Sequence, residues 1–138
     1  MTINIKNFLK DKSKLSKIGE FQNLKQIDGL EMASISADLY GDGRDDLALF
    51  YFSKGANYAT LTTSNSITAE FIPWNNSSHK KIIKGLLVNT KNANTFTGKQ
   101  GKESIDILAK NLSRILTIKE SKSQKGTNET VKIKDLIF

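Results

Sequence analysis

An asparagine-rich segment, Val88–Gly101, carries the side chains of this sequence that are best suited to hold a ligand or a reacting group. Each asparagine amide offers donors and an acceptor, so neighbouring amides can hold a backbone in an unusual path. A Thr-Gly pair follows where a helix is expected to begin, and Gln100 completes a capping box with that threonine. Such a helix start can present backbone N–H groups to an anionic ligand. The candidate residues are Asn89, Asn92, Asn94, Thr97 and Gly98.

Two flanking elements must position these residues. The apolar run Ile82–Val88 predicts a strand that leads into the segment. Gly98–Leu116 predicts a helix, because its apolar residues recur at the spacing of one helical face. That face consists of Ile105, Leu108, Ala109, Leu112, Ile115 and Leu116. We therefore expect the candidate residues in a loop between a strand and an amphipathic helix.

Further strands are expected upstream. Leu30–Leu39 reads as an extended strand, and Leu47–Phe52 is nearly continuously apolar, which is typical of a buried central strand. Gly41-Asp42-Gly43 between them predicts a tight turn, because glycine adopts the positive φ that hairpins need. Tyr58–Thr63 is rich in β-branched and aromatic residues and predicts a third strand.

The remaining segments give weaker patterns. Ser66 is placed to cap a short helix that ends before Pro73, since the residue before a proline avoids helical angles. Glu120–Thr130 has no apolar residue and predicts a loop. Val131–Phe138 is apolar and extended, and an apolar end of this kind suggests an incomplete domain.

Together these patterns predict an α+β fold. We expect a mixed or antiparallel sheet of four or five strands, with the helix at 98–116 packed on one face. The fold should cover residues 27–138, preceded by a basic N-terminal segment at 1–26.

The composition narrows the function classes. The chain has no cysteine, which excludes disulfides, zinc–thiolate sites and thiol nucleophiles. Its net charge of +7 comes from lysines that are spread along the sequence without interleaved aromatics, so we expect no nucleic-acid partner. No apolar run approaches the ~20 residues that span a bilayer. Met1–Ile18 lacks the apolar core of a secretory signal, so we expect a cytoplasmic protein with no membrane partner.

The asparagine-rich segment resembles a signature of the ornithine acetyltransferase family, which reads approximately V-N-S-G-N-A-N-A-x-T-G-x-x-G. Eight residues match in register, namely Val88, Asn89, Asn92, Ala93, Asn94, Thr97, Gly98 and Gly101. Thr90 and Lys91 depart from the pattern, and Lys91 replaces a glycine although lysine adopts positive φ poorly.

Two other segments are similar to the same family. Asp28–Leu49 resembles its opening hairpin, and Ala59–Asn65 resembles its G-V-F-T-T-N segment. Glu70 stands where the family has a proline. The resemblance covers about residues 27–138.

The resemblance implies a bifunctional glutamate N-acetyltransferase of arginine biosynthesis. These enzymes cleave themselves before a threonine, which then carries the acetyl group from N-acetylornithine to glutamate. An S-T-G segment supplies the oxyanion hole. In the family, that segment directly follows the strand that here ends at Phe138, and the threonine comes later still. The chain therefore resembles only the N-terminal portion of the enzyme.

Several expectations follow from this resemblance. The chain holds no catalytic residue, metal or cofactor, and we expect it to be inactive alone. Asn89, Asn92, Asn94, Thr97 and Gly98 are expected to form a wall of the substrate pocket. A purely structural role is equally compatible, in which the amides hold the loop and cap the helix. The implied partners are N-acetylornithine, glutamate and a complementing C-terminal chain.

Other functions stay open at this point. A truncated relative could act as a binding module for a small molecule or a protein. Asp38–Asp46 also resembles a calcium loop, but Tyr40 replaces an expected carboxylate and the motif occurs once. His79 is expected to be a solvated loop residue, and Trp74 a packing residue at a turn.

Overall fold

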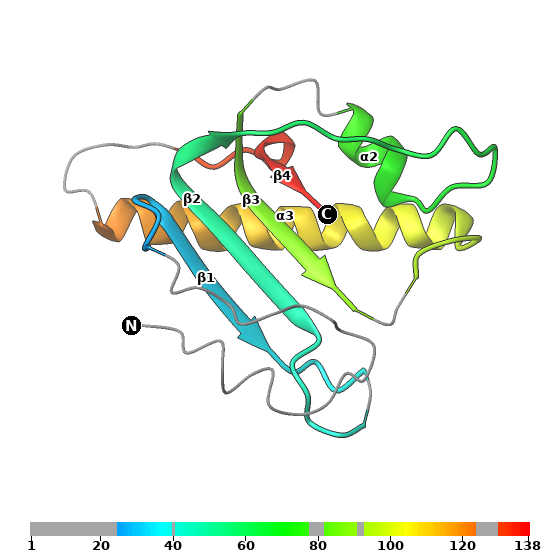
Figure 1. The fold of residues 1–138 in the computed structure, drawn as a ribbon, viewed down its shortest axis with the longest axis horizontal. Coiled ribbons are helices and arrows are strands. Elements are labelled where there is room, and N and C mark those ends of the chain that lie inside the picture. Colours follow the sequence, from blue (N-terminus) through cyan, green and yellow to red (C-terminus); the bar gives the residue numbers. More distant parts are fainter. Residues whose placement is uncertain (1–24, 40, 78–81, 91–92, 124–129) are drawn as a thin grey trace.

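A four-stranded sheet with a long helix along one face forms the protein in a computed structural model (Figure 1). The structure describes residues 25–39, 41–77, 82–90, 93–123 and 130–138. The predicted basic segment, apart from its last residues, and His79 lie outside this part of the chain. The strands are β1 (Leu30–Ile35), β2 (Leu47–Asn57), β3 (Ile82–Asn89) and β4 (Leu136–Ile137). The α-helices are α2 (Phe71–Ser77) and α3 (Gly98–Ser123), and a 3-10 turn spans Ile133–Asp135.

The sheet is mixed, and its strands lie in chain order. β1, β2 and β3 are antiparallel neighbours, whereas β4 runs parallel to β3. A parallel neighbour requires a crossover, and α3 provides it. The predicted antiparallel pairing of β1 and β2 is confirmed, with Leu30 opposite Phe52 and Ile35 opposite Leu47. The two strands are joined by residues 36–46 rather than by a tight turn at Gly41-Asp42-Gly43 alone. Because β3 and β4 are parallel, their carboxyl ends lie at the same edge of the sheet, and this edge carries the candidate site.

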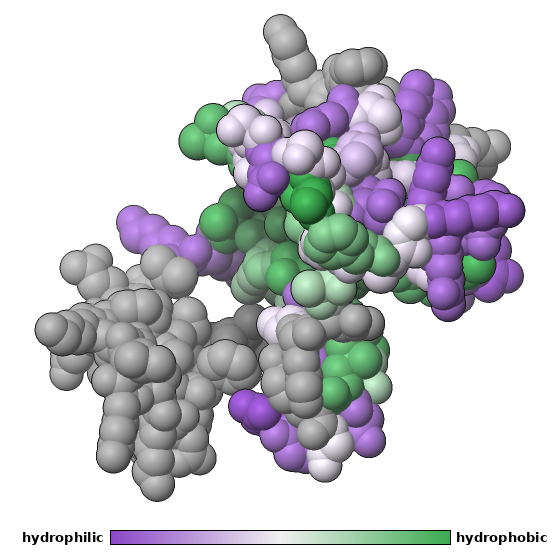
Figure 2. Space-filling model, turned by 90° about the vertical axis from the view of Figure 1, so that its right-hand side faces the viewer, coloured by the Kyte–Doolittle hydropathy of each residue, from purple (hydrophilic) through white to green (hydrophobic). Residues whose placement is uncertain are grey.

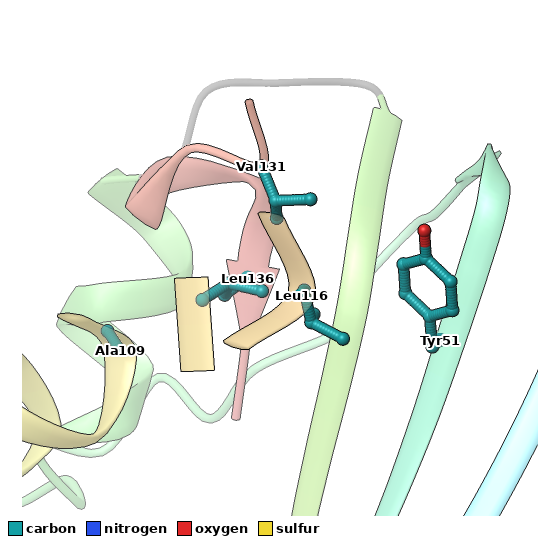
Figure 3. Packing of buried hydrophobic residues seen from close by; sticks show 5 residues of the cluster. All are labelled: Tyr51, Ala109, Leu116, Val131 and Leu136. Carbon is teal, nitrogen blue, oxygen red and sulfur yellow. The ribbon is translucent and has the colours of Figure 1, made fainter. Parts of the chain in front are cut away.

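The core lies between α3 and the sheet (Figure 3). Its buried cluster consists of Tyr51, Ala109, Leu116, Val131 and Leu136. The helix at 98–116 thus packs on one face as predicted, but its predicted apolar face is only partly correct. Leu108 and Ile115 are about half exposed (49% and 55%). The sheet covers only a narrow stripe of α3, and the side chains of Leu108 and Ile115 lie beside that stripe.

A polar cluster fixes the last turns of α3 to the sheet. The Glu120 carboxylate accepts hydrogen bonds from Tyr51 Oη at 2.7 Å and from Lys84 Nζ at 3.0 Å. Glu120 is buried, and its Oε2 has no hydrogen-bond partner among the described residues. The helix therefore continues through Ser123, and the predicted loop at Glu120–Thr130 begins too early.

The face of the sheet that points away from α3 is apolar. The Tyr51 side chain contacts Glu120 of α3, so it points to the face that α3 covers. Successive side chains of a strand point to opposite faces, so the neighbours of Tyr51 in β2, and the residues paired with those neighbours, point away from α3. We call this the open face; it consists of Leu30, Met32, Phe50, Phe52, Leu86 and Val88. Met32 is 50% exposed and Val88 39%. Figure 2 shows hydrophobic residues gathered in the middle of one side of the molecule.

The predicted strand at Tyr58–Thr63 is wrong. The described chain has no strand there, and Leu61 is fully exposed. Within the described residues, the sheet has free edges at β1 and β4, but this segment pairs with neither of them. The β propensity of a segment needs such a partner to take effect.

Two further boundaries differ from the prediction. The short helix does not end before Pro73 but contains it, as the third residue of α2. The first N–H groups of a helix have no intrahelical partner, so proline is tolerated there. β4 is limited to two residues, because Ile133–Asp135 forms a 3-10 turn in place of the extended chain expected for Val131–Phe138. β1 likewise ends at Ile35 rather than Leu39.

Candidate functional site

The loop between β3 and α3 is tied to both helices. Its Asn94 carbonyl oxygen accepts a hydrogen bond from the Glu70 backbone N–H at 3.0 Å, just before α2. Thr95 pairs with Ala69 in an isolated antiparallel bridge. Asn94 Nδ2 also lies 3.5 Å from the Gly101 carbonyl oxygen, in the first turn of α3. These contacts hold the loop close to the start of α3.

Thr97 acts within the loop rather than as the predicted side-chain cap. Its hydroxyl donates to Asn94 Oδ1 and lies 3.4 Å from the Asn94 carbonyl oxygen. Its own carbonyl oxygen accepts the first helical hydrogen bond, from the Gly101 N–H at 3.3 Å. The capping box expected with Gln100 is therefore replaced by an Asn94–Thr97 contact.

Gly101 allows this close approach of loop and helix. A methyl group at Gly101 would overlap Thr97 Oγ1 and Asn94 Oδ1, and would lie 2.7 Å from Thr97 Cβ. Gly98, the first residue of α3, has a φ of 52°, a value that glycine adopts without strain. The two glycines thus have different roles, one in packing and one in backbone conformation.

Asp46 holds the neighbouring loop at the same edge of the sheet. It is 2% exposed, and its carboxylate accepts hydrogen bonds from the backbone N–H groups of Ala37 at 2.6 Å and Leu39 at 2.7 Å. Its carbonyl oxygen accepts a hydrogen bond from the Thr90 N–H at 2.9 Å, directly after β3. The carboxylate considered above as a calcium ligand is thus bonded to backbone donors. Within the described ranges, no group of three His, Cys, Asp or Glu residues could hold a metal ion.

α2 fixes the carboxyl end of β4. The Asn75 amide donates from Nδ2 to the Phe138 carbonyl oxygen at 2.6 Å and accepts from the Phe138 N–H at 3.1 Å. Trp74 packs edge-on against the Phe138 ring, with the ring centroids 5.9 Å apart. Trp74 is a packing residue, as expected, but in a helix rather than at a turn. The chain position at which β4 ends is therefore held by two side chains of α2.

Strained backbone marks both loops at this edge. Asp38 has a φ of 58° and Phe96 one of 61°, which are unusual values for residues other than glycine. Phe96 is also 81% exposed, although it is a large apolar side chain. Such conformations persist only where surrounding contacts hold them, and they are frequent at ligand sites.

The structure brings four of the five predicted site residues to this edge. Asn89 ends β3, Asn94 and Thr97 lie in the loop that follows, and Gly98 begins α3. Asn92 lies outside the described residues. The sequence reasoning missed the contacts of Asp46 and Asn75, because their partners are backbone groups. Their positions next to a strand start and within a helix gave no signal of these contacts.

This arrangement of loops carries the pattern of a known family. The model of the ArgJ family matches residues 31–127 of the chain. The chain belongs to the ArgJ family. The predicted resemblance to ornithine acetyltransferases is thus confirmed, and the match includes the loop and α3.

Curated relatives support the assignment to the ArgJ family. The arginine biosynthesis bifunctional protein ArgJ of Zymomonas mobilis subsp. mobilis is 34% identical over 83 residues, which are 59% of this chain and 20% of the relative. That of Bartonella henselae is 30% identical over 101 residues, or 72% of this chain and 25% of the relative. The chain therefore spans a quarter or less of the length of these relatives.

Solved ArgJ structures share the fold. The ornithine acetyltransferase of Mycobacterium tuberculosis, solved as a complex with ornithine, superposes with a TM-score of 0.64 at 21% identity, covering 80% of this chain and 54% of that chain. The ArgJ protein of Bacillus halodurans gives a TM-score of 0.60 at 18% identity, covering 80% and 51%. No described helix is long and apolar enough to cross a membrane.

Proposed function

We propose that this chain supplies the N-terminal portion of a glutamate N-acetyltransferase, which transfers an acetyl group from N-acetylornithine to glutamate in arginine biosynthesis. The observation that carries this proposal is the ArgJ-family match over residues 31–127. The ornithine bound by the Mycobacterium tuberculosis structure supports an amino-acid substrate of this class.

The edge at the carboxyl ends of β3 and β4 is the proposed place of the substrate pocket. Its wall would consist of Asn89, Asn92, Asn94, Thr97 and Gly98. The contacts of Asn94 with Thr97 and with the Glu70 N–H support a rigid wall, because a reacting group must be held in place to be positioned. The same contacts also stabilise the loop, so the structural and functional roles are compatible.

The chemistry of acetyl transfer would need groups beyond this wall. The family resemblance places an oxyanion segment directly after the position of Phe138, and a nucleophilic threonine further on. Loss of one oxyanion donor lowers a rate by ~10²–10³, and loss of the nucleophile removes the covalent route. We therefore propose that the chain works with a polypeptide that carries the C-terminal portion of the family fold.

The open face is the proposed docking surface for that polypeptide. Its apolar side chains include Met32 and Val88, which are 50% and 39% exposed. The relatives carry three quarters or more of their length outside the matched segment. The family fold therefore includes a large further portion that could occupy this face. Contiguous exposed apolar surfaces commonly mark interaction sites.

The first test is an acetyl-transfer assay on the purified 138-residue chain. We expect no transfer of labelled acetyl from N-acetylornithine to glutamate, because the nucleophile and the oxyanion segment are missing. The unmodified Zymomonas mobilis relative serves as the positive control. Turnover by the isolated chain would contradict the proposal.

A chimera tests the positive half of the proposal. The segment of the Zymomonas mobilis relative that matches this chain is replaced by the corresponding residues of this chain. We expect the folded chimera to retain acetyl transfer, since the replaced segment supplies the wall and the donor relative supplies the catalytic groups. A folded chimera that binds neither substrate would show that this chain has lost the family function.

A further inference from the structure

A cavity opens between α2, α3 and the segment before β4. Its volume is about 530 Å³, within the range of ~300–1,000 Å³ that is usual for small-molecule sites. Its lining includes Trp74, Ser113, Val131, Lys132, Ile133 and Lys134. None of them belongs to the asparagine-rich loop, so this cavity is not the proposed wall of the acetyl-transfer pocket.

The walls of the cavity are fixed by contacts within the chain. Ser113 Oγ donates to the Val131 carbonyl oxygen at 2.5 Å, and Thr117 Oγ1 accepts from the Val131 N–H at 3.0 Å. Trp74 is held from the other side, because its ring packs on Phe138 and its Nε1 lies 3.5 Å from the Leu136 carbonyl oxygen. The entropic cost of ordering these walls when a ligand binds should therefore be small.

The lining combines an aromatic and aliphatic surface with positive charge. Trp74 and Ile133 offer apolar contacts, and the charged lining residues are the exposed Lys132 and Lys134. The nearby Asp135 carboxylate does not line the cavity; it is buried and accepts a hydrogen bond from the Lys132 backbone N–H at 3.0 Å. A flat apolar body with one negative charge fits this combination.

We propose that this cavity binds a small aromatic carboxylate, with the ring against Trp74 and the carboxylate near the Lys132 ammonium group. An ammonium and a carboxylate attract each other, and the indole offers a flat surface to an aromatic ring. The proposal goes beyond acetyl transfer and does not depend on it.

The single tryptophan of the chain makes the test direct. Its fluorescence and its one indole N–H resonance report on the cavity wall itself. The 138-residue chain is titrated with benzoate, and with benzamide as a neutral molecule of the same shape. We expect a saturable change with benzoate that includes the Trp74 indole and the Val131 and Lys132 amide resonances, and at least fivefold weaker binding of benzamide.

Two charge variants complete the test. Lys132→Gln is expected to weaken benzoate binding about fivefold, as for the loss of one partly exposed ion pair. Lys122→Gln removes the same charge in the last turn of α3 and is expected to leave binding unchanged. Absence of saturable binding, equal binding of benzamide, or equal effects of the two variants would overturn the proposal.

Discussion

Because Gly101 has no side chain, the asparagine-rich loop can approach α3 closely. The loop folds back so that Asn94 and Thr97 occupy the space where a side chain of residue 101 would lie. This explains in physical terms why a glycine is needed in the first turn of a helix, where glycine is normally unfavourable by ~1 kcal/mol relative to alanine.

We expect Gly101→Ala to destabilise the protein by about 2 kcal/mol, because the overlap outweighs the gain in helix propensity. Urea unfolding followed by circular dichroism measures the change. Gln100→Ala, an exposed neighbour in the same turn, serves as the control and should shift the free energy of unfolding by about 0.5 kcal/mol or less. A stabilised Gly101→Ala protein would show that the loop is not held against the helix.

At the level of single residues, the sequence predicted which side chains gather but not what they contact. Asn94, Thr97 and Gly101 were recognisable from their order in the chain. The role of Asp46 was not, because its carboxylate binds the backbone of Ala37 and Leu39, and the path of that loop is a property of the folded chain. Hydrogen bonds to backbone groups leave no pattern in the sequence of the acceptor.

Among the elements, α3 depends on a buried ionic contact at its end. Glu120 joins Tyr51 of β2 and Lys84 of β3, so one side chain links the helix to two strands. The side chains of Lys84 and Glu120 are 18% and 8% exposed. The cost of removing a buried charge is large when its partner keeps its own charge.

Glu120→Ala is expected to lower the free energy of unfolding by about 3 kcal/mol, because it takes away the carboxylate that Lys84 and Tyr51 share. Glu103→Ala is the matched control on the same helix. Glu103 pairs with Lys99 at 3.7 Å on the surface, and its loss should cost about 0.5 kcal/mol or less. If both variants lowered the free energy of unfolding equally in the same experiment, the buried contact would contribute no more than the surface ion pair.

The end of α3 also shows why its length was underestimated. The helical pattern of apolar residues stops at Leu116, and Glu120 begins a stretch of polar residues that reads as a loop. The contact that continues the helix is polar, and it joins residues that are far apart in the sequence. Strands were predicted where apolar runs lie inside the sheet, as in β2 and β3, although β2 continues past the predicted end at Phe52 to Asn57. The prediction was wrong at Tyr58–Thr63, because this segment pairs with neither free edge of the sheet.

For the whole molecule, the two faces of the sheet differ in what covers them. α3 lies against one face (Figure 1). On the open face, Met32 and Val88 are 50% and 39% exposed. The family and fold class could be predicted from the sequence because the motifs and apolar runs are local. That the described helices cover only one face could not be predicted, because it depends on which strand faces meet α3.

Met32→Lys is expected to block docking of a C-terminal portion of the family fold while changing the stability of the chain by about 1 kcal/mol or less, since Met32 is half exposed. The measurement is pull-down of the purified C-terminal portion of the Zymomonas mobilis relative, together with urea unfolding. Ile107→Lys places the same charge on an exposed part of α3, where Ile107 is 59% exposed, and should leave docking unchanged. If only Ile107→Lys blocked docking, the helix and not the open face would be the interaction surface.

The parallel placement of β4 beside β3 sets an order for folding. β1, β2 and β3 meet through successive antiparallel neighbours, whereas β4 reaches β3 only after α3 has formed the crossover. Contacts between residues far apart in the sequence are slow to form because closing a long loop costs entropy. The three-stranded sheet is therefore expected to assemble first, and the edge that carries the candidate site is completed last, when Phe138 docks on α2.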